Sequence, residues 1–499
     1  MARSIRVVIV GGGIGGIAQA VALKRQGIDD IAILERGERV GGTWQANTYP
    51  GLACDVPSHL YSFSFAPNPN WSRRFSPGPE IREYVEEIAR REGLLDKVRL
   101  NADVQRATWD DETGRWTVDL ADGGRYEADV LVTAVGQLSR PAIPPIPGLD
   151  AFQGPLFHSA HWDHDASLSG KRVACIGTGA SAIQFVPQVA EQAAHVTIFQ
   201  RSAPWVLTKP DREYPQRVKD LHAKHPGLLR LWRNGWRLWM ESLVPLFTGR
   251  PERTARALSK WYGFNSRLNR FIQLRGDRAL FKATEPDHAI GCKRILITSN
   301  WYPTLRRRNV ELVNGGAREI TADGVVDASG RHHEADAIVF GTGFATTGFL
   351  APMAVTGRDG LALDEAWADG AEAYLGITVK GFPNLFLVYG PNTNHGTGSI
   401  ITVHEAATNY TAQAVRALAD ERAERIEVRP EVHDRFVAEM EDRLRDSVWT
   451  SCASWYVNEA GRITNNWPGS HREYVQRVRR VDLADYDTKA PVREPAAAS

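Results

Sequence analysis

The chain has 499 residues, and at roughly 150 residues per domain this length predicts about two to four domains. Because 60 Lys or Arg are balanced by 59 Asp or Glu, the net charge of +1 provides no field that would gather nucleic acid or an acidic membrane, and small-molecule partners are favoured. The four cysteines contain no C-x-x-C pair, so we expect small apolar thiols, no disulfide framework and no metal site, in a cytoplasmic protein.

The N-terminal residues follow the pattern of a dinucleotide-binding unit. Residues 7–10 form an apolar run without polar alternation, which is typical of a parallel strand buried on both faces. Gly11, Gly13 and Gly16 then precede a helical pattern, and such glycines allow a tight turn, close approach of a pyrophosphate and close packing of helix on strand. The next strand ends at Glu35, whose carboxylate suits ribose hydroxyls and repels a 2′-phosphate, so this unit is predicted to bind FAD.

A β-meander and a stiff connector come next. Residues 107–136 alternate apolar and polar positions around two turns, at 112–114 and 122–124, and finish in a strand of the buried type. The proline-rich residues 136–148 cannot continue a β-ladder, because proline fixes φ and lacks an N–H donor. We therefore expect a domain boundary near Pro147.

A second unit repeats the plan of the first. Gly177, Gly179 and Ala182 occupy the fingerprint positions after a buried-type strand, and the following strand leads to Arg201. Arg201 lies 24 residues after Gly177, as Glu35 lies 24 residues after Gly11. A guanidinium offers a planar fork to a 2′-phosphate, so this unit is predicted to bind NADPH; a solvated surface arginine is the alternative reading.

Residues 211–278 predict a helical insertion rich in tryptophan. Three tryptophans share one helical face and three arginines are interleaved with them: Trp232, Trp236, Trp239, Arg230, Arg233 and Arg237. A membrane-surface helix is one reading. A helical lid or packed helix that shapes a substrate entrance is favoured, because the stretch lies inside a domain and aromatic rings pack well with arginine stems. No apolar run approaches the roughly 20 residues that span a bilayer, so membrane association is not expected.

The remaining segments complete an α/β architecture. A buried-type strand at 337–340 meets the glycines of 341–343, and a later strand leads through a Gly-rich turn into a helix over 399–419. That helix could direct its N-terminus at an anionic ring edge, or the turn could be an ordinary βα turn. We expect two dinucleotide-binding, Rossmann-like domains: an FAD domain (1–147 and 385–488), an NADPH domain (148–210 and 279–384) that carries the helical insertion (211–278), and a disordered tail (489–499).

The segment that joins the two units carries a specific fingerprint. Phe152, Gly154, His158, Trp162 and Asp163 form F-x-G-x-x-x-H-x-x-x-W-D. This pattern resembles the type I Baeyer–Villiger monooxygenases, a family of class B flavoprotein monooxygenases. For His158 and Trp162 a hinge role is favoured over a catalytic one, because hinges couple domain motion to hydride transfer.

Two further motifs carry the same resemblance, which covers nearly the whole chain. The pattern G-G-x-W-x-x-x-x-Y-P-G-x-x-x-D spans residues 41–55 and ends at Asp55, and residues 291–312 bring Lys293 and Arg294. The chain departs from the usual Ala-Thr-Gly at 134–136, where it has Ala-Val-Gly, and at 341–343, where it has Gly-Thr-Gly. Both sites keep the final glycine, so FAD binding is still expected.

The resemblance implies an enzyme that uses FAD, NADPH and O₂ to insert one oxygen atom next to a ketone carbonyl. The product would be an ester or lactone, formed through a C4a-peroxyflavin and a Criegee intermediate, with sulfoxidation as a possible side activity. A flavin monooxygenase that oxidises only N or S atoms is the alternative. A disulfide reductase would need a C-x-x-x-x-C pair, which the sequence lacks. The ketone and the oligomeric state are left open.

The resemblance also implies roles for single residues. Arg294 would stabilise the peroxide and the oxyanion, Asp55 would orient Arg294, and Lys293 would join Arg201 on the 2′-phosphate. Trp455 resembles a loop aromatic that closes over NADP⁺ and substrate. The other expected cofactor contacts are Thr43, Trp44, Tyr61, Val104, Thr178, Ser181, Gln184, Ser202 and Asn392.

Overall fold

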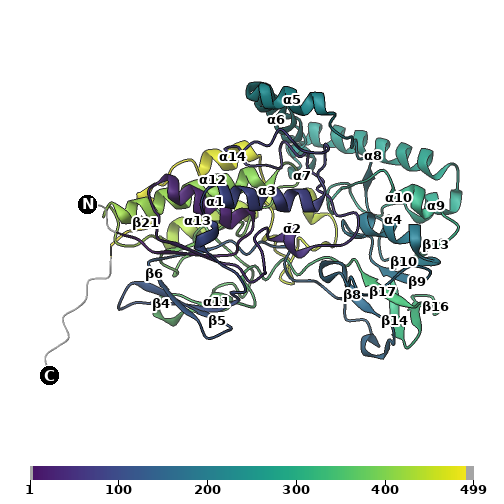
Figure 1. Ribbon diagram of the computed structural model, residues 1–499, viewed down its shortest axis with the longest axis horizontal. Helices are drawn as coiled ribbons and strands as arrows, with labels where there is room; N and C mark the ends of the chain where they lie inside the picture. The colour runs from purple at the N-terminus through teal and green to yellow at the C-terminus, as the bar shows by residue number, and fades with distance from the viewer. Residues whose placement is uncertain (1–3, 490–499) are drawn as a thin grey trace.

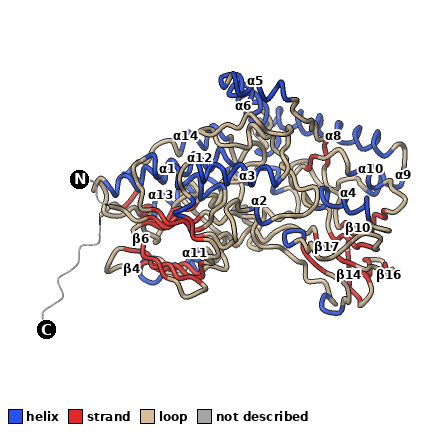
Figure 2. The backbone as a smooth tube through the Cα atoms, in the orientation of Figure 1, coloured by secondary structure: helices blue, strands red, loops and turns tan. Residues whose placement is uncertain are grey.

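Two parallel β-sheets form the centres of two lobes, and a layer of helices lies across the top of both lobes in the view of Figure 1. The structure is a computed structural model that describes residues 4–489. The expected tail therefore lies outside the described residues, apart from residue 489. Figure 2 shows that each parallel sheet has helices on one side and a second, smaller sheet on the other.

The sheet of the first lobe has five parallel strands. Their order is β19 (Leu385–Leu387), β7 (Val130–Thr133), β1 (Val7–Val10), β2 (Ile31–Leu34) and β3 (Val98–Arg99). All four residues of β1 are buried, as the continuous apolar run predicts for a strand covered on both faces. Helix α1 packs against α12 over this sheet. The helices of this lobe are α1 (Ile14–Arg25), α2 (Thr43–Ala46), α3 (Gly78–Arg91), α12 (Ile400–Ala419), α13 (Pro430–Arg445) and α14 (His471–Arg477).

The predicted meander forms the smaller sheet of the first lobe and then returns to the parallel sheet through β7. Its order is β18 (Ala354–Thr356), β4 (Val104–Asp110), β5 (Arg115–Leu120) and β6 (Arg125–Ala128). Strand β18 pairs with β4, and Val355 lies in the same hydrophobic core as Trp116. The expected boundary at residue 384 is therefore wrong, because residues from β18 onward build the first lobe.

The second lobe repeats the architecture of the first. Its parallel sheet has the order β13 (Val310–Asn314), β10 (His195–Gln200), β9 (Arg172–Ile176), β17 (Ala337–Phe340) and β8 (Leu156–His158). Helices α4 (Ala182–Gln192), α9 (Arg278–Ala283) and α10 (Trp301–Leu305) lie on one side of this sheet, and an antiparallel sheet lies on the other (Figure 1). The antiparallel strands are β14 (Ala317–Thr321), β15 (Gly324–Asp327) and β16 (His332–Glu334).

The chain crosses between the lobes twice, and the two crossings lie side by side. Pro141 forms a β-bridge with Phe344. The Ala142 N–H donates to Gly343 O at 2.9 Å, and the Thr342 hydroxyl donates to Ala142 O at 2.6 Å. The first crossing lies a few residues before Pro147, whereas the second precedes residue 384 by about 40 residues.

The insertion of residues 211–278 is helical, as expected. It contains α5 (Gln216–Lys224), α6 (Pro226–Glu241), α7 (Val244–Thr248) and α8 (Glu252–Leu274). Although it interrupts the second domain in sequence, α6 is fastened to the first lobe by Arg233, whose Nη1 donates to the carbonyls of His59, Leu60 and Ser62. Trp236 packs against the hydrophobic core of the first lobe. Within residues 4–489, no helix has the length and apolar character to cross a bilayer.

Short elements complete the fold. They are the strand pairs β11 (Val206–Leu207) with β12 (Leu296–Ile297) and β20 (Glu427–Val428) with β21 (Tyr486–Asp487), helix α11 (Leu363–Ala366), and the 3₁₀ turns η1 (Leu95–Lys97), η2 (Leu149–Ala151), η3 (Ser159–His161), η4 (Arg358–Gly360), η5 (Val448–Thr450) and η6 (Leu483–Asp485).

Candidate active site

The first glycine-rich turn joins β1 to α1 and has the geometry of a dinucleotide cradle. Gly11 has φ +109°, and a Cβ there would lie 2.5 Å from the carbonyl oxygen of Ala134. The Glu35 carboxylate accepts hydrogen bonds from the Gly12 N–H at 2.7 Å and the Gly37 N–H at 2.8 Å. The turn, the helix N-terminus and the carboxylate thus fit the pyrophosphate and ribose of FAD.

The second glycine-rich turn, between β9 and α4, reproduces this geometry. Gly177 has φ +108°, and a Cβ there would lie 2.5 Å from the carbonyl oxygen of Gly341. The contacts of Gly11 with Ala134 and of Gly177 with Gly341 are equivalent, which explains why both Ala-Val-Gly and Gly-Thr-Gly serve at these places. Arg201 follows β10 directly and is exposed, and its contact with a 2′-phosphate stays a prediction.

Asp55 and Arg294 meet between the lobes. The Arg294 Nε donates to Asp55 Oδ2 at 3.0 Å, and a second guanidinium nitrogen donates to the same oxygen. Burial would raise the pKa of Asp55, but the charge and hydrogen bonds of Arg294 hold it below its ordinary value. The side chain of Arg294 is still 46% exposed, so part of the fixed cation is accessible to a ligand.

Three residues near this pair were not predicted from the sequence. Lys209 adds positive charge that helps to lower the pKa of Asp55. Burial raises the pKa of Tyr456 to about 12 and the pKa of Tyr389 still further, although the nearby Arg294 charge opposes both shifts. Both hydroxyls therefore remain protonated and can donate hydrogen bonds beside a cation. No local motif marks these residues, because three distant segments bring them together.

Comparison with known proteins decides the family. The model of the flavin-binding monooxygenase-like family matches residues 4–228. A Baeyer–Villiger monooxygenase of Streptomyces coelicolor is 44% identical over 497 residues, which cover 98% of this chain and 93% of that protein. The chain belongs to the Baeyer–Villiger monooxygenase family. The resemblance inferred from the three motifs is thereby confirmed.

Solved structures of the family share the whole architecture. An oxidized steroid monooxygenase bound to NADP has a TM-score of 0.84 and 31% identity, over 96% of this chain and 97% of that one. The OTEMO complex with FAD and NADP has a TM-score of 0.84 and 25% identity, over 96% and 98% of the two chains. The α/β fold with two Rossmann-like domains is thus the fold of this family, as predicted.

The family's second motif, residues 41–55, lies along the interface between the lobes. The Trp44 Nε1 donates to the Tyr61 hydroxyl at 3.2 Å, and Thr43 begins helix α2. From α4 in the other lobe, Gln184 accepts from the Tyr49 hydroxyl at 3.0 Å and donates to Ala53 O at 2.9 Å. Gln184 therefore connects the two lobes, and its expected cofactor contact stays a prediction.

Residues around the second turn also form a connected group. The Lys293 Nζ donates to the Ser202 hydroxyl at 2.9 Å, and the Thr178 hydroxyl donates to Ser202 O at 3.3 Å. Lys293 thus contacts the residue that follows Arg201, and the phosphate contact expected of the two residues stays a prediction. Gly179 and Ser181 precede α4, which begins at the buried Ala182.

The fingerprint segment is not a free linker. Strand β8 forms the edge of the second parallel sheet, where a Cβ at Gly154 would lie 2.4 Å from Asp336 O. The His158 Nδ1 accepts from the Ala160 N–H, and burial lowers the pKa of His158 to about 4, so the ring is neutral at pH 7. The other members of the fingerprint also make contacts within this lobe. Phe152 packs on the core formed by β9 and β14, and the Trp162 ring packs against Phe157 and Phe185. The Asp163 carboxylate accepts hydrogen bonds from the Asp165 and Ala166 N–H groups.

Three expected cofactor residues have structural partners in this fold. Val104 begins β4 and its side chain is buried in the core of the meander. Asn392 donates to Ile463 O at 3.1 Å and to Asn466 O at 3.0 Å. Trp455 is 39% exposed and its ring lies 4.0 Å from that of Tyr456, beside the Arg294 region. Their contacts with cofactors remain predictions.

The expectation that the cysteines form no disulfide is wrong for one pair. Cys292 and Cys452 are joined by a disulfide, whereas Cys54 and Cys175 are free and buried. Because Cys292 precedes Lys293 and Cys452 precedes Trp455, the bond connects the segment of Arg294 to the loop of Trp455 and Tyr456. The sequence offered no signal for this pairing, since 160 residues separate the two cysteines. Between residues 4 and 489 no cluster of His, Cys, Asp and Glu has a metal-binding arrangement.

Reduction of this disulfide is expected to lower the free energy of unfolding by about 2 to 4 kcal/mol, because the bond restricts a long segment of the unfolded chain. Urea unfolding with and without a phosphine reductant measures the effect. The double variant C292A/C452A is the control and should not respond to reductant. Identical midpoints for the unmodified protein in both conditions would contradict the expectation.

Proposed function

We propose that this protein oxidises a ketone to an ester or lactone with one oxygen atom of O₂, and that NADPH is the electron donor. The observation that carries the proposal is the Asp55–Arg294 pair, which holds a permanent cation between two dinucleotide-binding lobes. FAD and NADPH are the cofactors, as the two turns predict and as FAD- and NADP-bound structures of the family support. FAD, once reduced, supplies the electrons that activate O₂.

Arg294 supplies the charge that this chemistry needs. A guanidinium does not lose its proton in this setting, since the Asp55 charge raises the pKa of Arg294 further. Its two donors to one Asp55 oxygen fix its orientation and leave its remaining N–H groups available for a developing negative charge. Asp55 is accordingly a positioning residue.

The fingerprint segment supports a hinge. The His158 ring lies 5.8 Å from the Phe344 ring, and Phe344 belongs to the second crossing between the lobes. Because the imidazole of His158 is buried and neutral, it connects the segment to Phe344 by ring packing and not by charge. We therefore assign His158 and Trp162 to the positioning of the crossings, on which rotation of one lobe against the other depends.

A panel of linear, cyclic and aromatic ketones tests the proposed reaction. We expect ester or lactone formation together with NADPH oxidation for at least one ketone class. Sulfide and amine substrates are assayed in parallel, because oxidation of heteroatoms alone is the alternative that the family relationship does not favour. Oxygenation of sulfides without any ketone product would contradict the proposal.

Arg201→Ala is expected to reduce the preference for NADPH over NADH by roughly tenfold or more, because a charge-assisted fork on a phosphate contributes about 1.5 to 3 kcal/mol. The measurement is kcat/KM for both coenzymes. Arg308→Ala is a matched control, since Arg308 is also exposed but follows α10 and not the strand that leads from the glycine-rich unit. Unchanged selectivity of Arg201→Ala would remove this residue from the coenzyme site.

A cytoplasmic location remains a proposal. The Cys292–Cys452 disulfide argues against it, because cytosolic reductants keep most protein thiols reduced. Alkylation immediately after lysis of the source cells tests it. Free thiols at both positions support a cytoplasmic location, and an intact disulfide opposes it.

A further inference from the structure

The outer face of α8 presents an apolar stripe to solvent. Trp261, Phe264, Leu268, Phe271 and Ile272 recur at helical spacing and are exposed, with Trp261 and Phe264 above 60%. The opposite face, with Ser266, Arg270 and Leu274, is buried against the protein. The hydrophobic side of this helix therefore points outward, which is the reverse of a helix on an ordinary globular surface.

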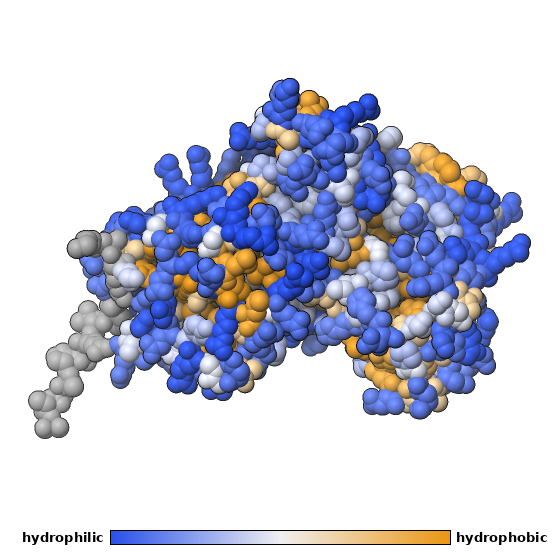
Figure 3. Space-filling view, viewed as in Figure 1, coloured by the Kyte–Doolittle hydropathy of each residue, from blue (hydrophilic) through white to orange (hydrophobic). Residues whose placement is uncertain are grey.

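Helix α6 repeats this arrangement. Leu231, Trp232, Leu238 and Trp239 are exposed, whereas Leu229 is buried and Arg233 and Trp236 face the first lobe. Core packing is met by Trp236, whereas Trp232 and Trp239 pack edge-on against the Trp236 ring and remain partly exposed to solvent; a role of the segment at a substrate entrance stays a prediction. Figure 3 shows apolar patches along the upper edge of the molecule, over α5 and α6 and again over α8.

Charge and apolar exposure are concentrated in the same segment. Residues 211–278 contain 15 Lys or Arg and six Asp or Glu, a net charge of +9, whereas the whole chain has a net charge of +1. Within residues 4–489, eleven of the 16 exposed large apolar side chains also belong to this segment. Exposed apolar patches of this kind mark interaction sites, and the surrounding positive charge selects an anionic partner.

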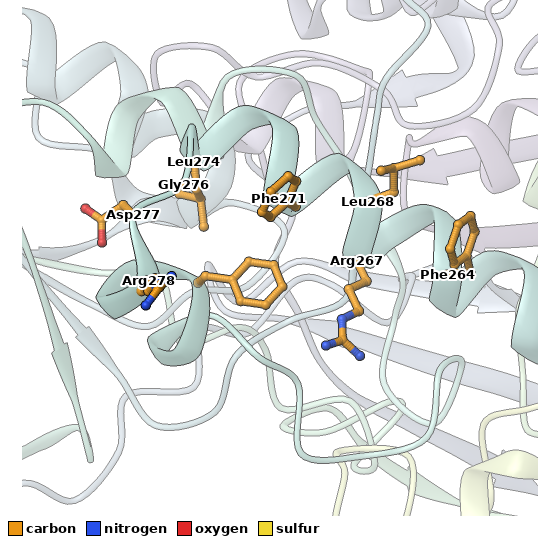
Figure 4. A pocket seen from close by; sticks show the side chains of 9 residues that line it. Phe264, Arg267, Leu268, Phe271, Leu274, Gly276, Asp277 and Arg278 are labelled. Carbon is orange, nitrogen blue, oxygen red and sulfur yellow. The ribbon is translucent and has the colours of Figure 1, made fainter.

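A groove lies beside the stripe of α8. It has a volume of about 450 Å³ and is lined by α8 and α9, with Phe264, Leu268, Phe271, Phe281 and Leu274 as its apolar walls. Figure 4 shows the apolar side chains projecting from α8 with the Arg267 guanidinium beside them. Arg267, Arg278 and Asp277 also line this groove, so its charged side chains sum to +1 beside apolar walls, an arrangement that suits an acyl chain below an anionic headgroup.

Against the expectation that the protein does not associate with membranes, we propose that the outer faces of α6 and α8 dock the enzyme on an anionic phospholipid bilayer. The apolar side chains would enter the headgroup region while the flanking Lys and Arg bind lipid phosphates, as in other interfacial basic amphipathic helices. A second copy of the chain is a poorer occupant, because a symmetric contact would bring two surfaces of +9 together. This docking surface is independent of the reaction that the active site performs.

Vesicle flotation with the FAD-loaded protein tests the proposal. We expect retention on phosphatidylcholine vesicles that contain about one third phosphatidylglycerol, weak retention on phosphatidylcholine alone, and loss of binding as salt rises. Arg253→Glu, Lys260→Glu and Arg267→Glu together should weaken binding at least about 100-fold, since each basic residue near an anionic surface contributes roughly a factor of five. Phe264→Ser with Phe271→Ser should also weaken it.

Matched controls separate docking from general effects of charge or exposure. Arg106→Glu, Arg308→Glu and Arg318→Glu reverse three exposed arginines outside the insertion, and Leu138→Ser with Ile143→Ser removes exposed apolar side chains elsewhere. Both controls should bind vesicles like the unmodified protein, and FAD absorbance verifies folding of every variant.

Three results would overturn the proposal. They are no retention on anionic vesicles, retention that the α8 variants do not reduce, or a dimer seen by light scattering that the α8 variants dissociate while vesicles are not bound. The last result would assign the same faces to a second copy of the chain.

Discussion

Arg294→Ala is expected to abolish ester formation while FAD stays bound and NADPH is still oxidised. The contacts of Glu35 and of the two glycine-rich turns do not involve Arg294, so we expect cofactor binding to survive its loss. Loss of one preorganised donor to a developing oxyanion costs about 2.7 to 4 kcal/mol, or roughly 10²- to 10³-fold, and loss of a full charge should cost at least as much. The two electrons from each NADPH would then reduce O₂ to hydrogen peroxide, without transfer of an oxygen atom to the ketone.

The measurement is the yield of ester and of peroxide per NADPH, with ¹⁸O₂ tracing the inserted atom. Arg294→Lys keeps the charge but not the two donors to Asp55, so it should restore only part of the ester yield. Arg308→Ala is the control for loss of an arginine outside the site. Undiminished labelled ester from Arg294→Ala would exclude this residue from the reaction.

Gly16→Ala is expected to yield protein with little or no FAD. A Cβ at Gly16 would lie 1.8 Å from the carbonyl oxygen of Gly11, which is a backbone atom, and Gly16 itself is buried, so no flexible side chain can give way. The turn from β1 to α1 must therefore move, and loss of one or more charge-assisted hydrogen bonds to the pyrophosphate should weaken FAD binding roughly 10- to 100-fold. The ratio of absorbance at the flavin maximum to that of protein measures the effect.

Gly235→Ala provides the matched control for this substitution. Gly235 lies within α6, and a Cβ there would meet no atom within 4 Å. Alanine favours a helix over glycine by about 1 kcal/mol, so this variant should retain FAD and be slightly more stable. Normal FAD content in Gly16→Ala would show that the turn tolerates the shift and would contradict the close-packing account of the third glycine.

Local sequence patterns were sufficient to predict the two glycine-rich strand–turn–helix units. A glycine-rich turn after a buried strand depends on backbone φ and on steric space, which neighbouring residues determine, so the roles of Gly11 and Gly177 could be predicted from the sequence. The positions of Glu35 and Arg201 could also be predicted, because the length of one helix and one strand places each directly after a strand, while their ligands stay predictions. The helical character of residues 226–241 and 252–274 also followed from local periodicity.

Only the tertiary structure decided which distant segments meet. The atoms of Arg294 and Asp55 come together across 239 residues, and Cys292 meets Cys452 across 160. Strand β18 returns to the first lobe, against the expected boundary at 384, because pairing with β4 buries Val355 in that lobe's core. Periodicity likewise showed that α6 has an apolar face but not which face would be covered. The Arg233 contacts with the first lobe determine that, and they leave Trp232 and Trp239 exposed.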